Sequence, residues 1–199
     1  TSLVQLISRL YDVKEGSVRV GGVDVRDYDL KALREQVSMV LQKNQLFAGS
    51  VKDNLRWGNP DATDEEVRAA ARLANADTFI RHLPKGYDTM LTAGGSGLSQ
   101  GERQLLSIAR AAVSDPPVLI LDEATSSIDT RTEMKIQHAF AQMMQGRTSF
   151  VVAHRLSTIE NADAILVMRD GKVVEKGSHA ELLRRNGFYA QLYNSQFAH

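Results

Sequence analysis

"VLILDEATSSID", residues 118–129, joins four consecutive apolar residues to two adjacent carboxylates. The apolar run shows no alternation with polar residues, which is typical of a strand buried on both faces in the parallel sheet of an α/β domain. Asp122 and Glu123 follow at the point where such a strand ends. Because burying carboxylates is costly unless a cation or hydrogen-bond donors compensate them, we expect a functional site here.

Three further runs have the same apolar character: "VSMVL" (37–41), "SFVVA" (149–153) and "AILVM" (164–168). They also predict strands of a parallel sheet that is covered by helices on both faces. Gln42 follows the first of these runs, and His154 follows the second.

Ligands of open parallel sheets bind at the carboxyl ends of the strands. We therefore expect Gln42, Asp122, Glu123 and His154 to gather at one edge of the sheet.

A long helical insertion separates the first two predicted strands along the chain, from about residue 50 to residue 114. "TDEE" (63–66) is a capping box that predicts a helix start, and "DPP" (115–117) ends the last helix of the insertion. Near the C-terminus, "RDGKVVEKG" (169–177) carries an Asp-Gly turn between strand-like segments, which predicts a hairpin. Ser178 with Glu181 predicts another capped helix.

"GLSQGERQ" (97–104) opens the last helix of the insertion and has two interpretations. Ser99 and Glu102 fit a capping box, which contributes on the order of 1 kcal/mol. The same helix start also suits an anion, because its free N–H groups and the helix dipole attract negative charge, and Gly101 lets a ligand approach the backbone.

Composition sets broad limits on function. The chain has 199 residues, of which 43% are hydrophobic and 24% charged, enough for one sizeable core. A formal net charge of zero argues against nucleic acid as a partner. The lack of cysteine excludes disulfides and thiolate metal sites. No apolar run reaches the roughly 20 residues that span a bilayer, so we expect a soluble polypeptide.

The adjacent carboxylates have a specific use in phosphoryl transfer. In such sites the first carboxylate holds Mg²⁺, and a neighbouring carboxylate polarises the attacking water. The alternative is that Asp122 and Glu123 only cap the next element, but this does not account for the apolar strand, the other polar strand ends and Asp129 together.

Five stretches of this sequence resemble motifs of the ATP-binding cassette (ABC) proteins, specifically the nucleotide-binding domain of exporter-type ABC transporters. They are "VLILDEA" as Walker B, "SSID" as the D-loop, "VLQKNQLF" as the Q-loop, "VVAHR" as the switch-histidine segment and "LSQGERQ" as the signature. The resemblance covers nearly the whole chain. It implies a single P-loop NTPase (RecA-like) domain over 1–199, with an α/β core at 1–49 and 115–199. The helical subdomain would span 50–114, and a C-terminal hairpin with helices would complete the core.

The resemblance also implies ATP and Mg²⁺ as ligands. Asp122 would hold the metal, Gln42 would contact the metal or the attacking water, and Glu123 would be the general base. His154 would bind the γ-phosphate and the attacking water. Gln42 would also link the site to the helical subdomain.

Two cassettes of this family face each other head to tail, with ATP between them. By resemblance, Ser99, Gln100 and Gly101 would contact the nucleotide held by the partner cassette, and Asp129 of the D-loop would lie at the same nucleotide-binding interface.

"TSLVQLISRLYD" (1–12) resembles the helix that follows a phosphate-binding loop. Thr1 would then be the hydroxyl residue that closes the loop and contacts Mg²⁺, and Ser2 would be its phosphate-binding neighbour. The glycines and lysine of the loop are not in this sequence. We therefore expect a domain truncated within that motif, which by itself would bind nucleotide poorly and hydrolyse little.

Two features depart from the family pattern. Gln100 and Glu102 replace a glycine and a glutamine of the signature, and an added carboxylate near a triphosphate is unfavourable. This resembles one half of a heterodimeric exporter with unequal ATP sites. The loop before the signature reads "AGGSG" (93–97) where exporters usually carry Gly-Glu, which affects how the domain meets coupling helices.

The predicted function is the ATP-hydrolysing motor of a membrane exporter, at the cytoplasmic side of the membrane and joined to a transmembrane domain of the same chain. A soluble ABC ATPase acting on nucleic acid or ribosomes is one alternative, and a non-catalytic cassette is another. The transported substrate is open between drugs, lipids and peptides.

Overall fold

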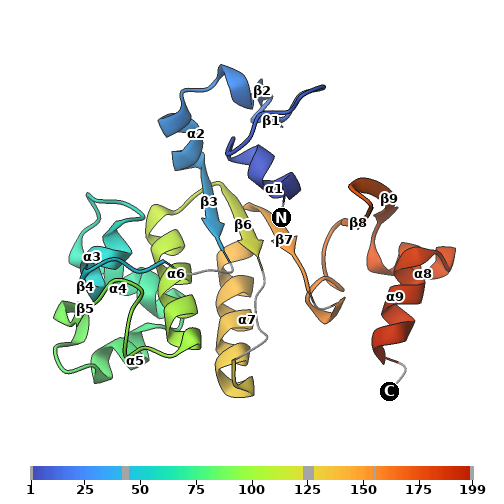
Figure 1. Ribbon diagram of the computed structural model, residues 1–199. Helices are drawn as coiled ribbons and strands as arrows, with labels where there is room; N and C mark the ends of the chain where they lie inside the picture. The colour runs from blue at the N-terminus through green and yellow to red at the C-terminus, as the bar shows by residue number, and fades with distance from the viewer. Residues whose placement is uncertain (1, 42–44, 123–127, 155, 198–199) are drawn as a thin grey trace. The chain divides into compact units, whose positions relative to one another are not determined.

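The computed structural model describes residues 2–41, 45–122, 128–154 and 156–197. The chain divides into two compact units, Thr1–Val152 and Ala153–His199, whose elements are drawn in Figure 1. The predicted α/β class is confirmed, because the first unit combines a parallel sheet with helices, and the second combines an antiparallel hairpin with helices.

The main sheet of the first unit contains three of the four predicted apolar runs. Its parallel strands, in spatial order, are β3 (Val37–Val40), β6 (Val118–Asp122) and β7 (Thr148–Val152). The register pairs Val40 with Leu121 and Asp122 with Val152. The strand that ends in Asp122 is therefore the central one of the three.

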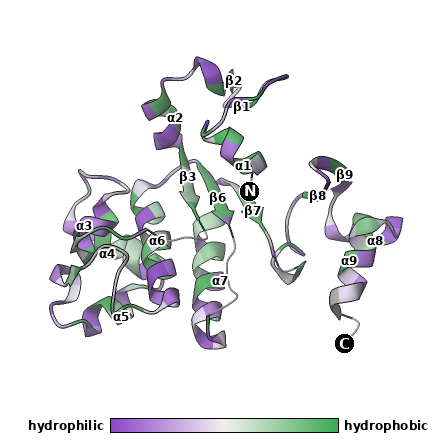
Figure 2. Ribbon diagram, viewed as in Figure 1, coloured by the Kyte–Doolittle hydropathy of each residue, from purple (hydrophilic) through white to green (hydrophobic). Residues whose placement is uncertain are grey.

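Alternate side chains of β6 enter two different hydrophobic clusters. Leu119 and Leu121 pack in the larger cluster with residues of the helices α6 (Gln100–Ser114) and α7 (Thr130–Met144). Ile120 packs in a smaller cluster with Val4 and Leu33. Figure 2 shows β3 and β6 as hydrophobic strands. The prediction of burial on both faces is thus confirmed for β6, whereas β7 is only partly buried and leaves 38% of Phe150 exposed.

Short elements precede β3 and cover one face of the sheet through the smaller cluster. They are α1 (Ser2–Ile7), β1 (Arg19–Val20), β2 (Val23–Asp24), the 3₁₀ turn η1 (Val25–Asp27) and α2 (Leu30–Gln36).

The predicted helical insertion lies between β3 and β6. It comprises β4 (Gly49–Ser50), α3 (Val51–Arg56), α4 (Asp64–Leu73), α5 (Asp77–His82), η2 (Gly86–Asp88), β5 (Met90–Leu91) and α6 (Gln100–Ser114). The capping box of Thr63 and Glu66 is confirmed at α4. A further box, of Ser50 and Asp53 at α3, was not predicted. The boundaries of the helical subdomain at 50 and 114 stay a prediction.

α7 (Thr130–Met144) follows the central strand and packs beside α6, as Figure 1 shows. α6 ends where predicted, because Asp115 adopts the left-handed conformation (φ 45°) and Pro116 follows.

The second unit contains the fourth apolar run in a different setting. Its elements are η3 (Leu156–Thr158), β8 (Ile165–Arg169), β9 (Lys172–Gly177), α8 (His179–Arg185) and α9 (Phe188–Phe197). β8 and β9 pair antiparallel around the predicted turn, where Asp170 and Gly171 both have positive φ. The capped helix at Ser178 is confirmed.

The prediction of a parallel strand is wrong for residues 164–168. Ile165 and Val167 are buried, whereas Leu166 and Met168 are exposed. This alternation is that of an antiparallel hairpin with one covered face, and an apolar run alone does not distinguish it from a strand covered on both faces.

No helix in the described part of the chain combines the length and the apolar character needed to cross a membrane.

Candidate functional site

Asp122 ends the central strand of the sheet. Only 4% of the residue is exposed, because β3 and β7 flank the strand and both of its faces are covered. A carboxylate in this position is set up to receive a cation or several donors. Thr1, Gln42 and Glu123 lie outside the described residues, so their positions at the site stay predictions.

Ser99 caps α6 through the predicted box. The Ser99 N–H donates to Glu102 Oε2 at 2.8 Å, and the Glu102 N–H donates to Ser99 Oγ at 3.2 Å. The capping interpretation of "GLSQGERQ" is therefore confirmed for this chain, and anion binding at the same helix start stays a prediction. Gln100, the first residue of the helix, is half-buried.

Gly101 lies where α6 approaches the start of α7. A Cβ on Gly101 would overlap Thr132 Cγ2 and would lie 3.5 Å from Ile128 Cγ2. A side chain here would collide with Thr132 unless that residue shifted, so glycine favours the close packing of the two helices. Gly101 was predicted to allow a ligand to approach the backbone closely, whereas this contact between two helices was not predicted.

Asp129 caps α7 and belongs to the same contact region. Its carboxylate accepts the Thr132 N–H at 2.9 Å, and this backbone hydrogen bond lowers the pKa of Asp129 below its usual value. Thr132 thus meets Asp129 through its amide and Gly101 through its methyl group. The structure thus brings Gly101 of the predicted signature close to Ile128 and to Thr132, which Asp129 binds, within one unit.

Two other predicted residues lie elsewhere in the chain. Ser2 is the exposed first residue of α1. His154 is exposed and belongs to the second unit, two residues after β7 ends.

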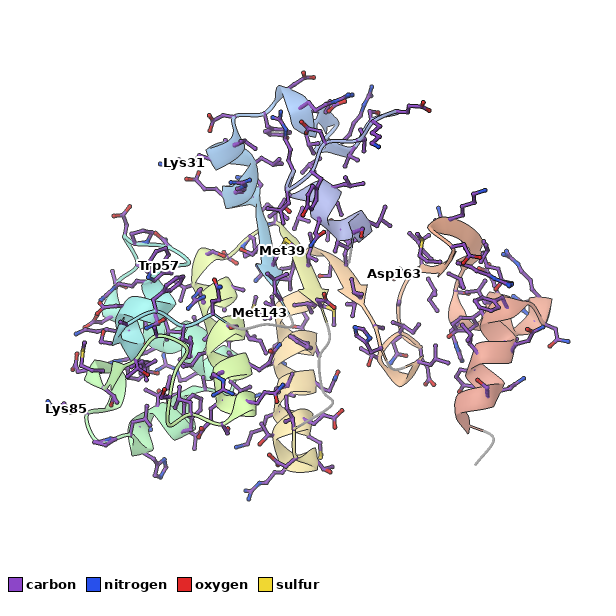
Figure 3. All side chains as sticks on the ribbon, in the orientation of Figure 1. Lys31, Met39, Trp57, Lys85, Met143 and Asp163 are labelled. Carbon is purple, nitrogen blue, oxygen red and sulfur yellow. The ribbon has the colours of Figure 1, made fainter. Side chains whose placement is uncertain are left out.

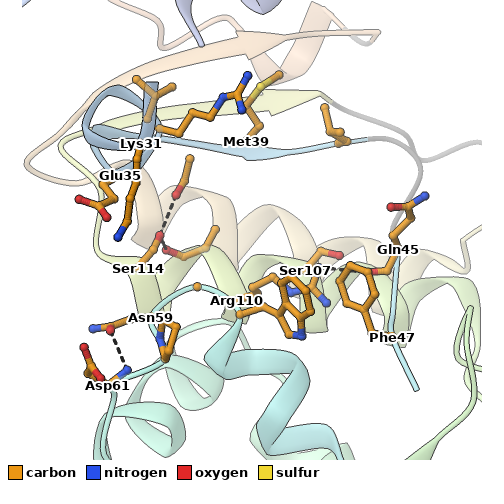
Figure 4. A pocket seen from close by; sticks show the side chains of 18 of the residues that line it. Lys31, Glu35, Met39, Gln45, Phe47, Asn59, Asp61, Ser107, Arg110 and Ser114 are labelled. Atoms are coloured by element: carbon orange, nitrogen blue, oxygen red, sulfur yellow. Dashed lines mark hydrogen bonds between the residues drawn. The ribbon is translucent and has the colours of Figure 1, made fainter. Parts of the chain in front are cut away.

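The first unit also has an open groove of about 1240 Å³ that the sequence analysis did not predict. It is lined by residues of α2, β3, α6 and the stretch 57–61, together with Gln45 and Phe47 (Figure 4). Phe47 and Trp57 stack with ring centroids 4.3 Å apart. Trp57 follows α3 (Figure 3) and is 62% exposed. An aromatic this exposed, beside a groove, is typical of an interaction surface.

The only sequence signal for this groove was the pair of aromatic residues Phe47 and Trp57. Lining residues such as Lys31 and Arg110 are far apart in the sequence, so local patterns do not connect them.

Comparison with known proteins decides the family. Residues 1–126 match the family model described as ABC transporter. The chain belongs to the ABC transporter family. Membership of this family implies nucleotide binding.

Several curated ABC proteins are similar to this chain. The ATP-dependent lipid A-core flippase of Desulfotalea psychrophila is 51% identical, over 98% of this chain and 34% of its own length. The fatty acid ABC transporter ATP-binding/permease protein of Mycobacterium bovis is 48% identical, over 96% of this chain and 30% of its own length. The chain thus spans about a third of the length of the curated relatives it matches.

A solved structure confirms the P-loop NTPase fold of an ABC protein. The structure of a bacterial Atm1-family ABC exporter with ATP bound is 41% identical and superimposes with a TM-score of 0.90. The match covers 98% of this chain and 34% of the exporter chain.

Proposed function

We propose that this chain is the ATP-binding and ATP-hydrolysing motor domain of an ABC exporter. One observation carries the proposal: Asp122 lies buried at the carboxyl end of the central parallel strand, where the Walker B resemblance expects the magnesium carboxylate. The likeness to an exporter structure with ATP bound supports it.

The donor set of the proposed metal site fits Mg²⁺. The ion prefers oxygen ligands, and Asp122, Thr1 and Gln42 offer carboxylate, hydroxyl and amide oxygens. When bound, Mg²⁺ neutralises charge that develops on the transferred phosphoryl group.

The other proposed residues act on the water and the phosphates. Glu123 takes the proton of the attacking water, an effect typically of about 10² to 10⁴ in rate. Gln42 and His154 orient that water and the γ-phosphate by hydrogen bonds, and Ser2 binds phosphate beside Thr1.

In this proposal a second cassette completes each site. Ser99, Gln100 and Gly101 face the nucleotide that the partner cassette holds, and Asp129 lies at the same interface. The N-terminus of α6 supports this role, since helix N-termini stabilise phosphate charge.

Glu102 supports a dissimilar partner. Its carboxylate is held at the N-terminus of α6, where it accepts the Ser99 N–H. A negative charge there weakens the binding of a triphosphate. We therefore infer that the site completed by this chain is the weaker of two unequal ATP sites.

The membrane partner in this proposal is a transmembrane domain of the same chain, and the motor domain lies at the cytoplasmic side of the membrane. Two observations support it: the names of relatives combine ATP-binding with permease, and the groove beside Trp57 offers an exposed aromatic surface. We propose that the transmembrane domain docks in this groove.

The test is Mg²⁺-dependent ATP hydrolysis by the full-length protein in lipid bilayers, compared with Asp122→Asn. We expect the variant to lose at least about 100-fold in kcat and to need a higher Mg²⁺ concentration, because one anionic ligand is lost. Asp163→Asn changes an exposed carboxylate of the second unit and serves as the control. Equal Mg²⁺ dependence of Asp122→Asn and the wild type would contradict the proposed role.

A further inference from the structure

We propose that Arg110 is a positioning residue that fastens residues 45–47 to α6, so that these residues move together with the helix that Ser99 caps. This inference rests on the proposed function, because it assigns Arg110 a role in ATP turnover.

The Arg110 guanidinium reaches two backbone carbonyls and one side chain. Its Nη1 donates to the Gln45 carbonyl at 3.0 Å, its Nε to the Asn54 carbonyl at 2.9 Å, and its Nη2 to Asn54 Oδ1 at 3.3 Å. The Phe47 ring covers the cation, with 5.5 Å between Cζ and the ring centroid. Figure 4 shows Gln45, Phe47 and Arg110 at one end of the groove.

Asn54 on α3 holds the same segment from another side. Its Oδ1 accepts the Phe47 N–H at 2.9 Å, and its Nδ2 donates to the Phe47 carbonyl at 3.0 Å and to the Ser50 carbonyl at 3.1 Å. Asn54 is 1% exposed. Because Asn54 Oδ1 also accepts from Arg110, α6 and α3 are joined through this amide.

A third contact comes from the loop before α6. The Gly94 N–H donates to the Leu46 carbonyl at 2.9 Å. A Cβ on Gly95 would lie 2.6 Å from Leu46 Cδ1, so the loop packs tightly on this side chain. Each carbonyl of residues 45–47 therefore accepts a hydrogen bond from a different element: α6, α3 or the loop at 94–95.

The chemistry of these contacts suits arginine and no other cation. The planar fork of the guanidinium supplies three donors in fixed directions and a flat face for the Phe47 ring, whereas lysine offers a single flexible ammonium. The acceptors are neutral oxygens, and burial lowers the pKa of Arg110 from its usual value. Arg110 is a half-buried cation of α6 that binds both the 45–47 segment and Asn54 of α3. It therefore links residues 45–47 to the helix that Ser99 caps.

The test measures hydrogen exchange of peptides covering 45–57, together with kcat and KM for ATP, in the full-length protein. Arg110→Met removes the donors and the charge, and Arg110→Lys keeps the charge without the fork. Arg68→Met is the matched control, because Arg68 also lies over a ring, that of Tyr87, but is exposed on α4.

For Arg110→Met we expect exchange in 45–57 about tenfold faster, consistent with the loss of the guanidinium hydrogen bonds. We expect kcat to fall about tenfold with KM changed less than about twofold, Arg110→Lys to be intermediate and Arg68→Met to match the wild type. If Arg110→Met does not fold, the Arg110→Lys variant decides the test through its hydrogen exchange in 45–57 and its kcat.

Unchanged exchange in 45–57 would overturn the fastening role. Faster exchange with unchanged kcat, or a rise in KM alone, would overturn the role in turnover. A wild-type protein that does not hydrolyse ATP would overturn the proposed function and the turnover role, whereas the exchange data would still decide whether Arg110 holds the segment.

Discussion

Thr132 meets two predicted site residues at the start of α7. Its amide is bound by the Asp129 carboxylate, and its methyl group fills the space where Gly101 would carry a side chain. Both residues were predicted from motif resemblance, but their shared neighbour was not, because 28 or more residues separate Gly101 from α7 along the chain. The contact gives Gly101 a packing role that does not depend on any ligand.

Gly101→Ala tests this packing at the residue scale. The new Cβ would overlap Thr132 Cγ2, so we expect a loss of about 1–3 kcal/mol in the free energy of unfolding, as for other overpacked sites. Thr132→Ser removes only the overlapping methyl group, and the double variant should recover most of the loss. Denaturant unfolding of the single and double variants measures the coupling energy between the two positions. If the two losses in unfolding free energy simply added, the contact between Gly101 and Thr132 would be contradicted.

Asp129 predicts a pH dependence of stability. Its pKa is lower in the folded chain than in the unfolded chain because it accepts the Thr132 N–H. The group therefore stabilises the fold above its unfolded pKa of about 3.9, and this stabilisation is lost as the pH falls through the folded value.

Asp129→Asn keeps a capping oxygen but no longer titrates. We expect the unfolding free energy of the variant to fall less steeply than that of the wild type below about pH 4. Denaturant unfolding at a series of acidic pH values measures the difference, and parallel curves would show that Asp129 does not contribute.

The elements differ in how well the sequence predicted them. The capping boxes at Ser99 and Thr63 and the turn at Asp170 rest on neighbouring residues, and all were confirmed. The run at 164–168 was predicted in a parallel sheet but lies in an antiparallel hairpin. The prediction failed because distant elements decide which faces of a strand are buried. The contacts of Arg110 with Gln45 and Asn54 span 65 and 56 residues, so no local pattern indicates them.

β6 and β7 give a prediction at the element scale. Ile120 and Phe150 are register partners, yet Ile120 is fully buried and Phe150 is partly exposed. Ile120→Ala should lower the free energy of unfolding by about 2–5 kcal/mol. Phe150→Ala should cost clearly less, since its ring already contacts solvent. Denaturant unfolding measures both losses. Equal losses of unfolding free energy in the two variants would show that the central strand β6 is not packed better than β7.

At the scale of the whole molecule, the chain combines a P-loop NTPase core, a helical insertion and a separate C-terminal unit. The motif resemblance predicted the family correctly, because its motifs recur along nearly the whole chain. The groove beside Trp57 was missed, because it is formed only when α2, β3 and α6 come together.

Trp57→Ala tests the groove as the docking surface of the transmembrane domain. The side chain is largely exposed, so the stability of the domain should change little, whereas ATP hydrolysis by the full-length protein in lipid should fall severalfold through lost docking area. Met134→Ala, at a similarly exposed apolar residue of α7, is the control. A loss of activity equal in both variants would argue against docking at Trp57.

The central claim, that this chain is an ATP-hydrolysing motor, is tested most directly by ATP turnover and ATP binding of the full-length protein with Glu123→Gln. Glutamine keeps the size of the side chain but cannot accept the proton of the attacking water. We predict that the variant retains ATP binding and loses about 10² to 10⁴ in turnover at its site, while Glu15→Gln, at an exposed carboxylate, has no effect. The measurement uses a protein in which this ATP site is the only one able to hydrolyse ATP. Unchanged turnover of Glu123→Gln in that protein would contradict the account.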